Sequence, residues 1–245
     1  MALVFGHRGY SEKFPENTML AFQEAEKAGA DGIELDVQLT RDGQIVIIHD
    51  ESLDRTTGGS GFVLEHSWAE LRRLDASKCC EGDFSDVHIP LLEEYFEWVR
   101  DTDLITNIEM KTAIFDYLPM EEKVIDMVKQ FELEDRVIIS SFNHYTIMRM
   151  QRKAPKLKFG FLTSACLIDV EKYLNNFDIY SYHPQYRSLK PEVIRAVRES
   201  GKKICCYTVD YPAEAVRLAK EGVEVIIGNR VEALLEALRE EDLHD

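Results

Sequence analysis

Short apolar runs alternate with amphipathic segments from one end of this sequence to the other, and this alternation is its strongest structural constraint. The apolar runs, rich in β-branched and aromatic residues, cover 3–6, 32–37, 45–49, 104–110, 137–141, 158–162, 177–182, 203–209 and 223–228. Amphipathic stretches between them include 19–28, 121–131, 191–199, 212–220 and 231–240. Strands that alternate with helices predict a parallel sheet with right-handed crossovers.

The predicted sheet is either open or closed into a barrel. An open, doubly wound sheet would produce the same alternation, so spacing alone does not exclude it. The number of predicted strands and the length of 245 residues both favour closure. We therefore predict an α/β protein with the (β/α)₈, or TIM, barrel fold, in which residues 1–245 form a single catalytic domain.

One segment, at about 51–90, breaks the alternation. It is rich in Gly, Ser and Asp and includes Thr57-Gly58-Gly59-Ser60-Gly61. Because it is too long for an ordinary loop, we predict a small insertion after the second strand region, with a short helix near Trp68–Leu74. The segment has too few apolar residues for a core of its own, so we do not count it as a second domain.

The formal net charge of −16 limits the partners of this chain. So acidic a surface repels nucleic-acid backbones and anionic membranes, and we expect neither as a partner. No apolar run reaches 18 residues and no signal-like segment is visible, which predicts a cytoplasmic protein without a membrane anchor. The five cysteines show no CxxC spacing, which favours reduced thiols. A homo-oligomer is left open.

Polar side chains gather where the predicted strands end. The barrel's strands present their carboxyl ends at one face, where enzymes of this architecture place their sites. Several distant segments therefore deliver histidines, carboxylates and cations to one rim. The residues in question are His7-Arg8, Glu34, Asp36, His49-Asp50, Glu109, Lys111, Ser140-Ser141-Phe142, His183, Tyr207-Thr208 and Asn229-Arg230.

Three carboxylates on this rim predict a metal site. Alternation along a strand places Glu34 and Asp36 on the same face, where they repel each other unless a cation or a shared proton intervenes. Glu109 stands at another strand end with Lys111 on its side. A structural ion pair would explain any one of them equally well, but three on one rim favour a metal. Oxygen ligands suit Mg²⁺ or Ca²⁺ better than zinc.

Two of the seven histidines differ from the rest. His7 and His49 each end an apolar run directly and precede a charged residue. Histidine exchanges protons near neutral pH with little tuning, so a pair of them suits acid–base catalysis. A single histidine at a strand end is commonly only hydrogen-bonded in place. Two beside three carboxylates make a catalytic pair the better interpretation.

The spacing of these residues also matches a known pattern. The matching segments are His7-Arg8-Gly9, Pro15-Glu16-Asn17-Thr18, Ala21-Phe22, Gly29-Ala30-Asp31, Glu34-Leu35-Asp36-Val37, Thr40, Asp42-Gly43, His49-Asp50, Arg55-Thr56-Thr57 and Ile108-Glu109-Met110-Lys111. Together they resemble the glycerophosphodiester phosphodiesterases, from Leu3 to about Asn229. Asp210 stands where that family usually has Asn, and Gly228 and Val231 stand where it usually has Thr and Pro.

The resemblance implies a role for each residue of the rim. Glu34, Asp36 and Glu109 would hold one divalent cation, Mg²⁺ or Ca²⁺. His7 and His49 would be the acid–base pair, in an order that the sequence leaves open. Arg8 and Lys111 would contact the phosphate, so that they and the dication make the pocket locally positive in an acidic protein.

Three residues at later strand ends are further candidates for substrate binding: Phe142, His183 and Tyr207. Aromatic side chains at such positions more often pack the barrel, and that alternative stays open for Phe142 and Tyr207.

The implied reaction is metal-dependent hydrolysis of a small-molecule glycerophosphodiester, such as glycerophosphocholine or glycerophosphoethanolamine, to sn-glycerol 3-phosphate and an alcohol. The rivals are a barrel phosphodiesterase of other specificity, such as a lysophospholipase D or a phosphoinositide-type lipase, and a non-catalytic phosphodiester-binding barrel. A sugar-phosphate isomerase would need a glycine-rich phosphate loop after its last two strands, and Gly228-Asn229 is too little for that.

Overall fold

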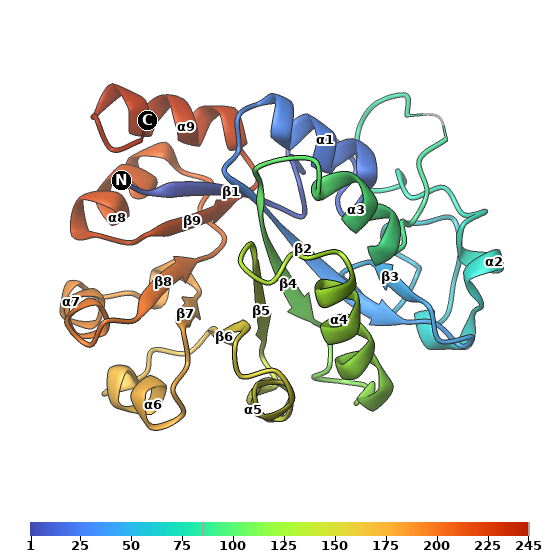
Figure 1. Cartoon of the computed structure of the whole chain (residues 1–245). Helices are drawn as coiled ribbons and strands as arrows, with labels where there is room; N and C mark the ends of the chain where they lie inside the picture. The colour runs from blue at the N-terminus through green and yellow to red at the C-terminus, as the bar shows by residue number, and fades with distance from the viewer. Residues whose placement is uncertain (85, 245) are drawn as a thin grey trace.

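Parallel strands close into a barrel in the computed structural model, which describes residues 1–84 and 86–244 (Figure 1). Among these residues the barrel has eight strands, and β1 pairs with both β2 and β9, which closes the ring. The predicted (β/α)₈ fold is confirmed. The barrel strands are β1 (Leu3–His7), β2 (Gly32–Leu39), β4 (Ile105–Met110), β5 (Val137–Ser141), β6 (Lys158–Thr163), β7 (Ser181–Pro184), β8 (Lys203–Cys206) and β9 (Val225–Gly228).

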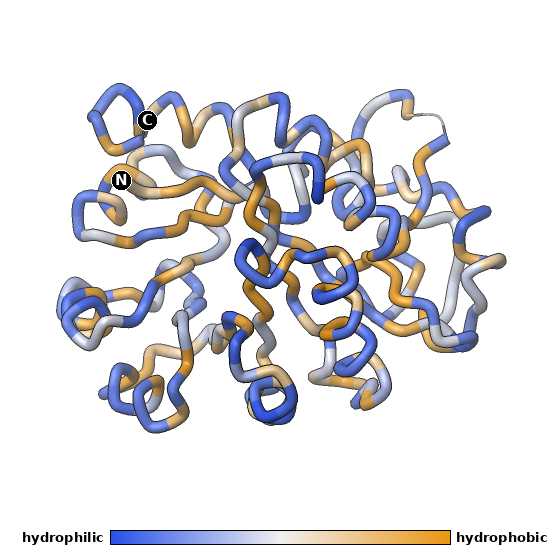
Figure 2. Tube along the Cα trace, viewed as in Figure 1, coloured by the Kyte–Doolittle hydropathy of each residue, from blue (hydrophilic) through white to orange (hydrophobic). Residues whose placement is uncertain are grey.

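Amphipathic helices surround the barrel and pack their apolar faces on it (Figure 1). Figure 2 shows apolar residues concentrated along the central strands, while polar and apolar residues alternate along the surrounding helices. None of the helices in the described part of the chain is long and apolar enough to cross a membrane. The helices are α1 (Met19–Lys27), α3 (Leu92–Val99), α4 (Leu118–Gln130), α5 (His144–Lys153), α6 (Val170–Asn176), α7 (Pro191–Glu199), α8 (Pro212–Glu221) and α9 (Val231–Glu240).

The apolar run predicted as a strand at 45–49 is not part of the parallel barrel. It forms β3 (Ile45–Ile47), which pairs antiparallel with β2. Only residues 40–44 connect the two strands, and so short a connection permits a hairpin but no parallel crossover. The hairpin returns the chain to the same rim, where the N–H of Ile48 donates to the carbonyl of Asp36 at 2.9 Å.

The run predicted as a strand at 177–182 also differs from the structure. Phe177 caps the end of α6, and the strand β7 begins only at Ser181. Ile179 is fully buried although it precedes the strand, because its N–H donates to the carbonyl of Leu174 and turns the chain inward. An apolar helix end and a short connection thus resemble a strand in sequence.

The insertion lies between β3 and α3, beside the barrel (Figure 1). It contains a 3₁₀ turn, η1 (Val63–Glu65), and the short helix predicted near Trp68–Leu74, which is α2 (Trp68–Leu71). Among the described residues, the buried side chains of the insertion share a small core with the hairpin of β2 and β3. That core contains Val46, Ile48, Leu53, Val63, Leu71, Ala76 and Ile89.

Candidate active site

The register of the first strands brings the predicted carboxylates and histidine together. His7 pairs with Glu34 across β1 and β2, and Asp36 pairs with Glu109 across β2 and β4. Ligand oxygens of Glu34, Asp36 and Glu109 all lie within 4.8 Å of one another, and all three side chains are buried. His7 Nε2 is 3.9 Å from Glu34 Oε2. Residues far apart in sequence thus form one acidic cluster at the barrel mouth.

Burial and the neighbouring Arg8 and Lys111 shift the pKa values of the three carboxylates in different directions. Burial and the neighbouring charge of Asp36 raise the pKa of Glu34 and of Glu109. Burial would also raise the pKa of Asp36, but Arg8 and Lys111 outweigh it and hold that pKa below its usual range. Lys111 Nζ contacts Glu109 at 2.8 Å and lies 3.8 Å from Asp36.

The cluster has the properties of a cation site. The three buried carboxylates lie close enough to repel one another when they are ionised, and a bound dication would offset that repulsion. Asp36 Oδ1 is buried and accepts no hydrogen bond from any described residue. Such an atom retains a lone pair for a ligand. The donor set is all oxygen, which fits Mg²⁺ or Ca²⁺.

Arg8 reaches the cluster through an unusual turn after β1. Its backbone is left-handed, with φ 57°, and Gly9 follows with φ 85°. A side chain at Gly9 would put its Cβ 2.7 Å from the backbone of Ala21, so only glycine fits this turn. Arg8 Nη1 contacts Glu16 at 2.7 Å, and its Nε is 3.5 Å from Asp36.

Asn229 at the end of β9 orients the imidazole of His7. Nδ1 of His7 lies 2.7 Å from Oδ1 of Asn229, which Ser11 also contacts. Asp210 accepts hydrogen bonds from the backbone N–H and from Nδ2 of Asn229. Burial and the charge of Arg8 lower the pKa of His7 to about 4. The ring therefore carries its hydrogen on Nδ1 and leaves Nε2 free to accept one.

His49 has a charged partner instead. Its Nδ1 lies 2.6 Å from Oδ1 of Asp50, whose other oxygen accepts from Nε of Arg55 at 2.7 Å. Arg55 also binds Glu16, the partner of Arg8. Sequence reasoning assigned no role to Glu16, Asp50, Arg55 or Asn229. All four lie in the segments that carry the family resemblance or in its last strand end, and that was the available signal.

Of the remaining substrate-binding candidates, Phe142 and Tyr207 pack against each other, whereas His183 lies inside the barrel. Tyr207 and Phe142 pack edge to face with ring centroids 6.0 Å apart, and Phe142 is 40% exposed. The hydroxyl of Tyr207 donates to the carbonyl of Thr163. His183 is fully buried inside the barrel, where its Nε2 lies 2.8 Å from Ser181 Oγ. Burial lowers the pKa of His183 to about 3.

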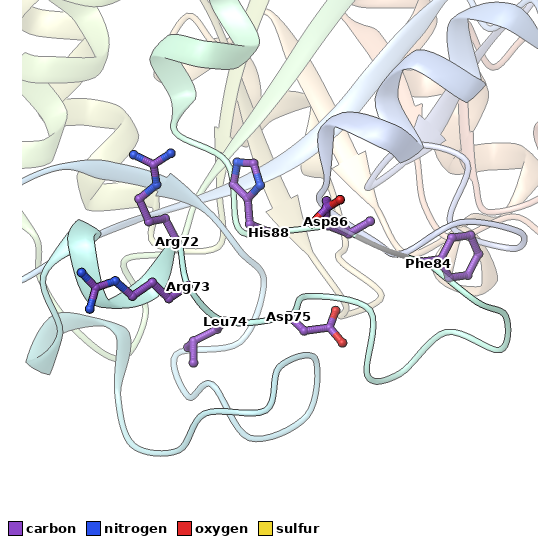
Figure 3. Close-up of a pocket in the computed structure, with 8 residues that line it drawn as sticks. Arg72, Arg73, Leu74, Asp75, Phe84, Asp86 and His88 are labelled. Atoms are coloured by element: carbon purple, nitrogen blue, oxygen red, sulfur yellow. The ribbon is translucent and has the colours of Figure 1, made fainter.

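Two surface cavities, one at the rim and one in the insertion, differ in the residues that line them. One, of about 380 Å³, is lined by His7, Arg8 and Asn229, of which His7 and Arg8 also contact the acidic cluster. The other, of about 450 Å³, lies in the insertion, where Arg72 and Arg73 extend from the end of α2 and Asp75 and Asp86 supply the opposite charge (Figure 3). The second cavity shares no residue with the cluster and is separate from the site.

Solved structures identify the class of protein that this fold and site define. An Oleispira antarctica phosphodiesterase, solved in complex with the product sn-glycerol-3-phosphate, matches with a TM-score of 0.92 and 26% identity over 98% of this chain and 97% of that one. A glycerophosphodiester phosphodiesterase from Thermotoga maritima matches with a TM-score of 0.78 and 30% identity over 96% and 98%. The chain has the architecture of the (β/α)₈-barrel phosphodiesterases.

Sequence comparison narrows the class to a family. The model of the glycerophosphoryl diester phosphodiesterase family matches residues 7–233. A curated glycerophosphodiester phosphodiesterase from Caldanaerobacter subterraneus is 44% identical over 237 residues, which cover 97% of this chain and 98% of that protein. The chain belongs to the glycerophosphoryl diester phosphodiesterase family, which confirms the predicted family and enzyme class.

Proposed function

We propose that the protein hydrolyses glycerophosphodiesters, such as glycerophosphocholine or glycerophosphoethanolamine, to sn-glycerol 3-phosphate and an alcohol, with one divalent cation. The observation that carries the proposal is the meeting of three buried carboxylates with two differently partnered histidines at one barrel mouth. The bound sn-glycerol-3-phosphate of the Oleispira antarctica relative supports the same product here.

The chain's own residues divide the binding of cation and phosphate between them. Glu34, Asp36 and Glu109 would hold the cation, Mg²⁺ or Ca²⁺. When bound, it supplies positive charge that offsets the charge growing on the phosphate oxygens. Arg8 and Lys111, which already face this cluster, would hold the non-bridging oxygens of the phosphate.

The hydrogen-bond partners of the two histidines support an assignment of acid and base. A base must begin unprotonated, and the neutral amide oxygen of Asn229 leaves the Nε2 of His7 free to accept a proton. The acid must hand over a proton from its free ring nitrogen, and the Asp50 carboxylate holds Nδ1 of His49, so that Nε2 is the nitrogen left for this transfer. We therefore assign the base to His7 and the acid to His49.

Proton transfer then accompanies the exchange at phosphorus. His7 takes the proton of the attacking hydroxyl, of water or of the substrate's own glycerol, as its oxygen bonds to phosphorus. Attack by the glycerol hydroxyl would give a cyclic phosphate first, which water would then open to sn-glycerol 3-phosphate. The bond to the departing alkoxide breaks with its electron pair, and His49 gives that oxygen a proton. Each transfer typically contributes roughly 10²–10⁴-fold in rate.

The substrate's organic part would lie against Phe142 and Tyr207, whose rings form an apolar wall at the mouth. His183 is buried and would act only from beneath the surface that substrate touches. Since the site uses residues from His7 to Asn229, we propose that the whole chain, 1–245, is one catalytic domain with the insertion at about 51–90 as its appendage.

The exposed ring of Phe142 favours a second candidate substrate, a lysophospholipid whose acyl chain would cover that ring. This would make the protein a lysophospholipase D. A direct comparison of kcat/KM for lysophosphatidylcholine and glycerophosphocholine separates the two. If Phe142→Ala lowers only the first value, the ring serves an acyl chain.

The first test is release of sn-glycerol 3-phosphate by EDTA-treated protein, with Mg²⁺, Mn²⁺ or Ca²⁺ added back. Metal-restored release from glycerophosphocholine or glycerophosphoethanolamine is expected, and neither His7→Ala nor His49→Ala should retain it. An absence of turnover with every metal and both substrates would contradict the proposed function and favour a phosphodiester-binding barrel.

A further inference from the structure

Two loops of the barrel mouth are joined by an alternating series of charged side chains. Arg8 contacts Glu16, Glu16 contacts Arg55, and Arg55 contacts Asp50, which holds His49. Each contact measures 2.6–2.7 Å at its shortest. The series begins at the arginine proposed to hold phosphate and ends at the histidine proposed to donate a proton.

Arg55 occupies the middle of this series with its whole guanidinium. Nε and Nη2 donate to the two oxygens of Asp50, at 2.7 and 3.0 Å. Nη1 and Nη2 donate to the two oxygens of Glu16, both at 2.7 Å. A planar fork that holds two carboxylates at once fixes their relative orientation, which an ammonium group does not achieve.

Asp50 depends on this fork for its orientation. Burial would raise the pKa of Asp50, but the hydrogen bonds from Arg55 and His49 lower it to about 2. The carboxylate is therefore ionised, and Arg55 aims its Oδ1 at Nδ1 of His49. With Nδ1 held in this way, Nε2 is the nitrogen of His49 that is left to exchange a proton with the substrate.

Stability alone is a weak explanation for these contacts. The side chain of Arg55 is 41% exposed, and ion pairs at such exposure contribute little to folding. Glu16, in contrast, is only 14% exposed, since Arg8 and Arg55 cover it from two sides. An arginine that binds both oxygens of two carboxylates, yet is itself this exposed, fits a role in orienting those carboxylates.

We infer that Glu16 and Arg55 are positioning residues, which align the proton-donating His49 with the phosphate held by Arg8. The inference rests on the proposed function of His49 as the acid. Without Arg55, Asp50 loses its fixed orientation and His49 donates its proton poorly. Without the charge of Glu16, both Arg8 and Arg55 lose their shared partner.

Two substrates that differ only in the leaving group separate these effects. The choline alkoxide of glycerophosphocholine needs a proton as it departs, whereas the p-nitrophenolate of glycerol phospho-p-nitrophenol leaves without one. Arg55→Ala should lower kcat for glycerophosphocholine by roughly 10²-fold and kcat for the nitrophenyl ester by less than about threefold. Guanidinium ion added to Arg55→Ala should restore part of the lost activity.

Glu16→Gln provides the second arm of the test. It should raise KM for both substrates, because Arg8 loses its partner, and lower kcat mainly for glycerophosphocholine. A double variant that carries Glu16→Gln and Arg55→Ala should discriminate between the two leaving groups no more than Arg55→Ala alone, because the two substitutions break the same series of contacts. Arg55→Lys, which keeps the charge but not the fork, should behave like Arg55→Ala and decides the matter if Arg55→Ala folds poorly.

Two controls keep the outcomes distinct. Arg41→Ala removes an exposed arginine that donates to one oxygen of Glu70 and to the carbonyl of Glu65, away from the site, and both activities should stay unchanged. His49→Ala should show the same selectivity as Arg55→Ala. Equal losses for both substrates in His49→Ala would overturn the proposed acid, whereas a selective His49→Ala beside an unselective Arg55→Ala would overturn the positioning role alone.

Discussion

Asp210 holds Asn229 by two hydrogen bonds, one from the backbone N–H at 2.8 Å and one from Nδ2 at 2.9 Å. Since Nδ2 faces a carboxylate, the amide of Asn229 has only one favourable orientation, with Oδ1 toward His7. This carboxylate therefore acts on His7 through Asn229 and determines which nitrogen of His7 carries the hydrogen.

Asp210→Asn should lower kcat by about 10- to 100-fold and leave KM nearly unchanged, because the misplaced base acts on the chemical step. The new side chain has one acceptor oxygen where two are used, so the amide of Asn229 can turn over. Steady-state kinetics measure the effect. Asp178→Asn, which alters an exposed ion pair with Lys202, is the matched control. A variant with unchanged kcat would show that His7 does not depend on this orientation.

Divalent cations should stabilise the folded protein through Glu34, Asp36 and Glu109. At a cation concentration about 100 times Kd, binding adds about 2.7 kcal/mol to the free energy of unfolding, which appears as a rise in Tm. Glu109→Gln should lose most of that rise, yet without metal it should be at least as stable as wild type, since one buried charge is gone. Glu236→Gln on an exposed helix position should respond like wild type. Equal rises in all three proteins would place the cation elsewhere.

Acid should destabilise the protein partly through His183. Its pKa is about 3 in the folded protein and about 6.5 in an unfolded chain, so between these values only the unfolded chain binds the proton. The contribution of neutral His183 to the free energy of unfolding is therefore complete above pH 6.5 and falls by about 1.4 kcal/mol per pH unit below it. Urea unfolding of wild type and His183→Gln from pH 7 to 4.5 measures the difference in slope. Parallel pH curves would mean that His183 takes up its proton while folded.

Gly160→Ala should reduce the free energy of unfolding by about 1–3 kcal/mol through overpacking. A Cβ there would collide with Nε2 of His183 and lie 2.9 Å from Oγ of Ser181, and both partners are fully buried. Gly58→Ala is the control, since a Cβ at Gly58 has nothing within 4 Å. Chemical denaturation of both variants tests this, and equal stabilities would show that the barrel interior relaxes around the methyl group.

Periodicity was sufficient to predict a parallel sheet, because alternation is a local property, while the number of strands and the chain length favoured closure into a barrel. It failed for β3, whose antiparallel direction depends on the five-residue connection to β2 and not on its own apolar residues. The carboxylate cluster followed from strand alternation for Glu34 and Asp36 and from a strand-end position for Glu109. Glu16 and Arg55 did not, because they lie in loops without periodicity and meet only through tertiary folding.

The pairing of the first and last strands has a consequence for the protein during its synthesis. His7 is made early, but its partner Asn229 follows 222 residues later, after the final strand that closes the ring. A growing chain that still lacks β9 has no oriented base, whatever else has already folded. The enzyme is therefore expected to be inactive while it emerges from the ribosome and to become active only when β9 pairs with β1 and closes the barrel.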